Sequence, residues 1–114
     1  MPEIVRLEPC AGSSHATFAR AALSNERNCL VLFDASWRGP RQQAEEQTAG
    51  IADRHGIAVL SVDVEECSEL ARRYLVAGVP SLLLFRNGQL IARRIGELSD
   101  RDLEDWIERL LAVA

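Results

Sequence analysis

The sequence predicts an α/β domain in which helices flank both faces of one mixed central sheet. Continuous apolar runs, such as CLVLF at 29–33, are typical of strands that are covered on both faces. These runs alternate with segments of helical periodicity. The dipeptide Asn87-Gly88 between two later runs indicates an antiparallel hairpin. With 114 residues, 47% of them hydrophobic, we expect a single domain spanning 1–114.

The first half of the chain predicts two strand and helix pairs and a third strand. We expect a short edge strand at 4–7, then a helix through 18–23 that Ser13-Ser14 can cap. Strands follow at 28–34 and 57–63. The long helix between them ends at His55-Gly56, where a cationic side chain suits the helix dipole.

The second half predicts a helix, a hairpin and a final helix. Residues 68–75 place Leu70, Ala71, Tyr74 and Leu75 on one helical stripe. Strands at 81–86 and 89–95 flank Asn87-Gly88, which suits the positive φ angles of a type I′ turn. Ser99 can cap the last helix, whose apolar residues recur at 3.6-residue spacing: Leu103, Trp106, Ile107, Leu110 and Leu111.

Composition excludes several classes of protein. A formal charge of -4 argues against a nucleic-acid partner, which usually meets a basic surface. No segment has the roughly 20 apolar residues of a membrane span, and the first eight residues lack the pattern of a signal peptide. Three cysteines without paired spacing do not make a disulfide framework. We therefore expect a cytoplasmic, bacterial-type protein without a membrane partner.

Metal and hydrolase chemistry are not expected either. His15 and His55 are isolated in the sequence, and no cysteine pair has the spacing of metal ligands. The serine, histidine and aspartate residues form no recognisable nucleophile arrangement. The sequence therefore predicts no metal site and no cofactor.

Four ordered segments carry a family resemblance. They are LVLFDASWRGPR at 30–41, VDVEEC at 62–67, GVPSLLLF at 78–85 with Asn87-Gly88, and IGELS at 95–99. Together they resemble the thioredoxin family from about residue 28 to the C-terminus. The resemblance implies the thioredoxin fold, a mixed sheet between helices.

The departures from that family lie where its chemistry would be. The family motif Trp-Cys-Gly-Pro-Cys has Arg38 and Arg41 in place of both cysteines. Dithiol exchange needs an attacking thiolate and a resolving thiol, and a guanidinium can act as neither. Leu32 and Ser61 replace an aspartate and a lysine that handle protons in active members. We therefore expect a redox-inactive protein rather than a dithiol enzyme.

The resemblance also implies a groove for an extended peptide. Its matching positions are Trp37, Gly39, Pro40, Val79, Pro80, Ile95 and Gly96. By resemblance the bond before Pro80 is cis, which leaves the Val79 backbone free to pair with a peptide strand. The predicted function is a peptide-binding, chaperone-like or adaptor module. The alternative is that Pro80 only shapes the fold.

Two interpretations of the arginines stay open. Arg38 and Arg41 at a helix start can form a seat for a carboxylate or phosphate, which makes an acidic peptide a candidate partner. Alternatively, both side chains point into water at little energetic cost.

The cysteines and the polar stretch at 42–48 suggest two further possibilities. Cys67 lies where a helix begins, which can lower a thiol pKa; a thiol-disulfide oxidoreductase or redox sensor acting through it is the alternative function. Cys29 is expected to be a buried hydrophobe. The polar stretch at 42–48 predicts a helix start that is mobile or covered by a partner, as in a subunit of a larger assembly.

Overall fold

A five-stranded mixed sheet forms the centre of the protein. The computed structural model describes residues 5–6, 18–23, 28–39 and 41–112. The strand order across the sheet is β1-β3-β2-β4-β5. β1, β3 and β2 run parallel, while β4 is antiparallel to β2 and β5 to β4. The strands are β1 Val5–Arg6, β2 Asn28–Asp34, β3 Ala58–Asp63, β4 Ser81–Arg86 and β5 Gln89–Ile95.

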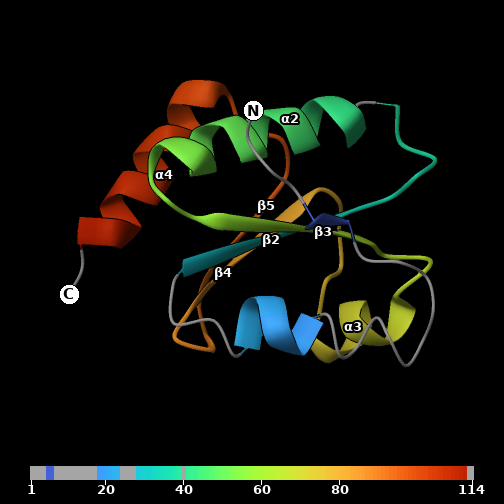
Figure 1. Ribbon diagram of the computed structural model, residues 1–114. Coiled ribbons are helices and arrows are strands. Elements are labelled where there is room, and N and C mark those ends of the chain that lie inside the picture. Colours follow the sequence, from blue (N-terminus) through green and yellow to red (C-terminus); the bar gives the residue numbers. More distant parts are fainter. Residues whose placement is uncertain (1–4, 7–17, 24–27, 40, 113–114) are drawn as a thin grey trace.

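Helices cover both faces of this sheet, as predicted. Figure 1 shows α2 and α4 on one face, and the short helix η1 with α3 on the other. Their bounds are η1 Ala19–Leu23, α2 Arg41–Arg54, α3 Ser68–Arg73 and α4 Asp100–Ala112. No helix in the described ranges is long and apolar enough to cross a membrane.

Each face of the sheet has its own apolar core. Leu30, Leu32 and Leu84 pack with α2 and with Leu103 and Ile107 of α4. On the opposite face, apolar strand residues pack with η1 and α3, and the members of this cluster include Phe18, Val31, Phe33, Leu70, Leu83 and Phe85. Successive strand residues thus pack alternately into the two cores, which explains why the sequences of the central strands are continuous apolar runs.

Local signals of the sequence explain the turns and helix ends. Ser99 Oγ accepts a hydrogen bond from Asp102 N at 3.1 Å, which confirms the predicted cap of α4. Asn87 and Gly88 have φ angles of 52° and 80°, in agreement with the predicted I′ turn. Gly56, with φ 67°, follows the end of α2.

The structure tests the predictions for the first elements only in part. Of the strand predicted at 4–7, Val5 and Arg6 are described and are a strand, and Ser13-Ser14 lies outside the described residues. The helix that follows, η1, is a π-helix. α3 ends at Arg73, and the chain then turns into the left-handed region at Leu75, with φ 57°. The prediction that Leu75 continues the buried stripe is therefore wrong, because its side chain is 76% exposed.

Candidate functional site

Two buried carboxylates lie side by side under the motif loop. Asp34 ends β2 and Asp63 ends β3, and they are register partners in the parallel pair. Asp34 has an exposed fraction of 0% and Asp63 of 1%. Burying a charge is costly unless it is paired and hydrogen-bonded. The two aspartates therefore require donors from the segments around them.

Arg38 supplies the donors for Asp34. Its Nε and Nη2 atoms each lie 2.7 Å from one carboxylate oxygen of Asp34, as a two-pronged ion pair. Its Nη1 atom donates to Glu97 in the loop before α4. Only 13% of the Arg38 side chain is exposed. The hydrogen bond to Asp34 is the main reason why the pKa of Arg38 lies above its usual value.

Arg41 plays the same part for Asp63. Its Nη1 atom donates to Asp63 Oδ2 at 2.7 Å, and its Nε atom lies 3.7 Å from Glu45 Oε2. Ser61 Oγ donates to the same oxygen of the buried Glu45 at 2.6 Å. Arg41 thus connects the first turn of α2 to Asp63 at the end of β3 and also lies near Glu45 in the next turn of the same helix.

Backbone N–H groups complete the environment of Asp63. Burial, the largest single influence, raises the pKa of this carboxyl, but the hydrogen bonds from Glu65, Glu66 and Ser36 together outweigh it. The donor distances are 2.8 Å from Glu65 N, 3.2 Å from Glu66 N and 2.9 Å from Ser36 N. The pKa of Asp63 consequently lies below its usual value.

These contacts change the interpretation of the arginines. The alternative in which Arg38 and Arg41 point into water is wrong, because 13% and 20% of their side chains are exposed and both hold carboxylates of their own chain. Binding of an external anion stays untested. The sequence contains a signal for these pairs, since Asp34 and Arg38, like Arg41 and Glu45, are four residues apart.

The polar start of α2 is explained in part within the chain. Glu45 and Thr48 are buried. Gln47 Nε2 donates to Leu98 O at 2.7 Å and to Asp100 Oδ1 at 3.0 Å. Glu45 and Gln47 thus have hydrogen-bond partners within the chain, in β3 and around the loop before α4. Gln42, Gln43 and Glu46 are exposed, and the expectation that this helix start is mobile or covered by a partner stays a prediction.

The predicted groove residues gather at the same edge of the sheet. The Val79-Pro80 bond is cis, and Pro80 O accepts a hydrogen bond from Gly96 N at 2.8 Å. A Cβ placed on Gly78 would lie 3.4 Å from Ile95 Cγ2. Because Arg38 is bonded to Glu97, the motif loop lies beside the end of β5. Pro40 is outside the described residues.

Large apolar side chains are exposed at this edge. Trp37 is 67% exposed and Ile95 56%. Gly39 is also exposed, and Val79 and Gly96 are half-buried. A cavity of about 440 Å³ opens beside Pro80 and Gly96, and Arg38, Leu32, Leu82, Ala44 and Leu98 are among the residues that line it. The site therefore offers exposed apolar side chains next to the ion pairs of Arg38 and Arg41.

The two described thiols are not accessible. Cys67 precedes α3, as predicted, but it is 6% exposed and packs in the core with Leu70. Cys29 is fully buried, and burial raises the pKa of its thiol to about 12. Both observations argue against a reactive cysteine among the described residues.

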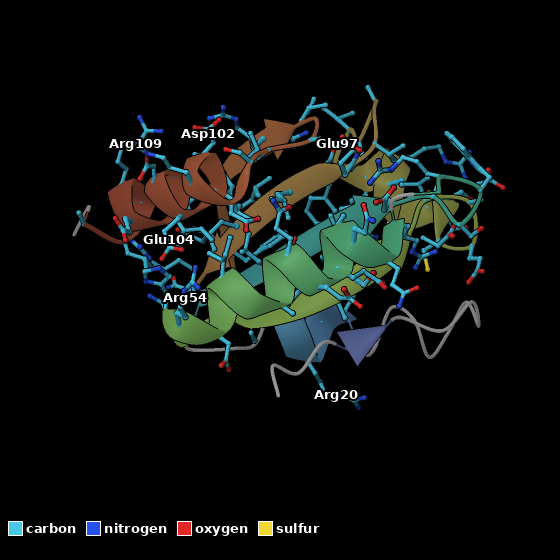
Figure 2. The ribbon with its side chains drawn as sticks, turned by 90° about the horizontal axis from the view of Figure 1, so that it is seen from above. Arg20, Arg54, Glu97, Asp102, Glu104 and Arg109 are labelled. Carbon is cyan, nitrogen blue, oxygen red and sulfur yellow. The ribbon has the colours of Figure 1, made fainter. Side chains whose placement is uncertain are left out.

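His55 is not isolated in space, although it is isolated in the sequence. Its Nε2 atom lies 2.9 Å from Glu104 Oε1, and Arg54 donates to the other oxygen of Glu104. Figure 2 shows Arg54 and Glu104 close together, far from Glu97. The isolation of His55 in the sequence does not extend to the fold, because α4 packs beside the end of α2. The expectation that the protein has no metal site stays a prediction.

Comparisons with known proteins agree with the fold. The family model Thioredoxin matches residues 10–109. A thioredoxin from Rhodospirillum rubrum is 33% identical over 99 residues, which cover 83% of this chain and 93% of that protein. A probable thioredoxin from Caenorhabditis elegans is 34% identical over 100 residues, covering 83% of this chain and 67% of that protein. A solved mutant thioredoxin from Halobacterium salinarum superposes with a TM-score of 0.77 at 29% identity, covering 98% of this chain and 94% of that one.

Proposed function

Because the chain belongs to the thioredoxin family, we propose that it is a redox-inactive member that binds an extended protein segment in its groove. The observation that carries the proposal is the replacement of both motif thiols by arginines that neutralise buried carboxylates. Such a site cannot exchange disulfides through its motif. It also resists rearrangement, because moving either arginine would leave a buried charge unpaired.

The surroundings of the cis proline support peptide binding. Trp37 and Ile95 expose apolar surface that a partner side chain can cover. Within the described part of the chain, the N–H and C=O groups of Val79 have no hydrogen-bond partner. An extended segment can pair with these groups as an added strand does.

The charge of the site favours a basic partner segment. Arg38 and Arg41 face four carboxylates, Asp34, Glu97, Asp63 and Glu45, which leaves a formal charge of -2. Glu65 and Glu66 add exposed carboxylates next to Asp63. We therefore propose an apolar segment with lysine or arginine, and the ion pairs argue against the acidic partner expected from the sequence.

No observation favours the alternative function through Cys67. A thiol buried among Leu70 and its neighbours cannot meet a substrate disulfide without local unfolding. The alternative still makes an opposite prediction, because alkylation or Cys67→Ser would abolish a thiol-dependent activity.

A random-peptide display selection on the immobilised protein tests the proposal. Ile95→Ala and Ile91→Ala form a matched pair, since both isoleucines are exposed on β5 and only Ile95 lies at the groove. We expect enrichment of apolar, basic peptides that bind the native protein and Ile91→Ala but bind Ile95→Ala and Trp37→Ala at least tenfold more weakly.

Several outcomes would contradict this proposal. Enriched peptides that bind all four proteins equally would place the binding surface elsewhere. Acidic peptides would contradict the charge argument, and insulin reduction with turnover would show that the protein is an enzyme.

A further inference from the structure

A second cluster of polar side chains lies at the opposite end of α2 from the motif. His55 follows α2, while Glu104 and Glu108 are one turn apart on α4 and therefore share a helix face. One donor atom from each of the three residues lies within 4.8 Å of the other two. We propose that these residues bind one divalent transition-metal ion, of which Zn²⁺ is the probe to use.

The donor set suits such an ion. Zinc takes imidazole nitrogen at about 2.0–2.1 Å and carboxylate oxygen at about 2.0–2.2 Å, which places tetrahedral donors about 3.4 Å apart. His55 Nε2 and Glu104 Oε1 are already 2.9 Å apart. A side-chain rotation at the exposed Glu108 closes the remaining gap.

The ligand chemistry favours a transition metal. The carboxylates of Glu104 and Glu108 offset the charge of a dication, and the Arg54 guanidinium on Glu104 leaves the cluster with a formal charge of +1 when the ion is bound. The mixture of nitrogen and oxygen ligands favours zinc or a neighbouring transition metal over Ca²⁺ or Mg²⁺. Arg54 donates to Glu104 Oε2, the oxygen that does not face His55. Such an outer hydrogen bond orients a ligating carboxylate.

The consequence of metal binding is a link between two helices. The ion would join the C-terminal end of α2 to the middle of α4, on the face of the sheet that both helices cover. It would leave the groove residues untouched. We expect the metal to stabilise the fold without altering peptide binding.

Zn²⁺ titration of the metal-free full chain by isothermal calorimetry tests this site. We expect one equivalent to bind, with at least a tenfold loss of affinity in His55→Ala and in Glu108→Gln. Glu108→Gln removes no ion pair of the described residues, so a loss of zinc affinity in this variant cannot be assigned to unfolding. Asp105→Asn is the matched control on the exposed side of α4 and should bind as the native protein does.

Two results would overturn the proposal. The first is the absence of stoichiometric binding to the native protein. The second is native-like affinity in both His55→Ala and Glu108→Gln, which would assign the zinc to other groups; His15→Ala then tests whether His15 is one of them.

Discussion

Replacing Arg38 by methionine tests whether the motif arginines hold the fold together. Methionine keeps the length and apolar stem of the side chain but leaves the Asp34 carboxylate, 0% exposed, without its two 2.7 Å donors. Breaking a buried ion pair on one side costs about 3–5 kcal/mol. The contact with Glu97, which is 64% exposed, adds at most about 1 kcal/mol. We therefore expect Arg38→Met to lose about 3–5 kcal/mol of unfolding free energy.

Urea unfolding of the native protein, three variants that complete a double-mutant cycle and one control variant measures this loss of stability. The variants are Arg38→Met, Asp34→Leu and the double variant, and the coupling energy of the cycle should reach about 2–3 kcal/mol. Arg101→Met, at an exposed position of α4, is the control and should change stability by less than about 0.5 kcal/mol. A loss in Arg38→Met no larger than in Arg101→Met would refute the counterion role.

Three further predictions concern acid stability, backbone strain and thiol access. The pKa of Asp63 in the folded protein lies below the value of about 3.9 for the unfolded chain. The ionised carboxylate therefore stabilises the fold above about pH 4, and this stabilisation is lost as the pH falls through the folded pKa. Asp63→Asn should thus unfold more easily at neutral pH and show a weaker loss of stability in acid, by urea unfolding at several pH values. Leu75→Gly should stabilise the fold by about 0.5–1 kcal/mol, because glycine relieves the left-handed φ of 57° while an exposed side chain loses little burial; a lower urea midpoint would contradict this. In a Cys10→Ser variant, Ellman's reagent should label Cys29 and Cys67 only on unfolding, and rapid labelling of the folded protein would show an accessible thiol.

The sequence predicted the fold well because its signals are local. The runs at 29–33 and 82–85 are apolar on both strand faces, and the structure covers both faces with helices. Ser99 and Asn87-Gly88 marked a helix start and a turn through contacts that span three or four residues. The exposure of Leu75 was not predicted, because its spacing from Leu70 and Ala71 fits a helix, whereas α3 ends before it, at Arg73.

The ion-pair network could not be predicted in full because it depends on register. Asp34 and Asp63 are far apart in the sequence, and only the parallel pairing of β2 and β3 makes them neighbours. That pairing buries two carboxylates, and Arg38 and Arg41 neutralise them through ion pairs. The contact of His55 with Glu104 was missed for the same reason, since it depends on how α4 packs beside α2.

The most direct test of a thiol-independent peptide groove is an NMR titration of the ¹⁵N-labelled protein with a selected basic peptide. The titration is run on the native protein and on a variant in which all three cysteines are replaced by alanine, because alkyl groups on the buried Cys29 and Cys67 would disrupt the core. We predict equal dissociation constants for both forms, with the largest shifts at the Trp37 indole N–H, Gly78 and Gly96. Binding that is lost in the folded cysteine-free variant, or shifts that spare these three residues, would contradict the proposed function.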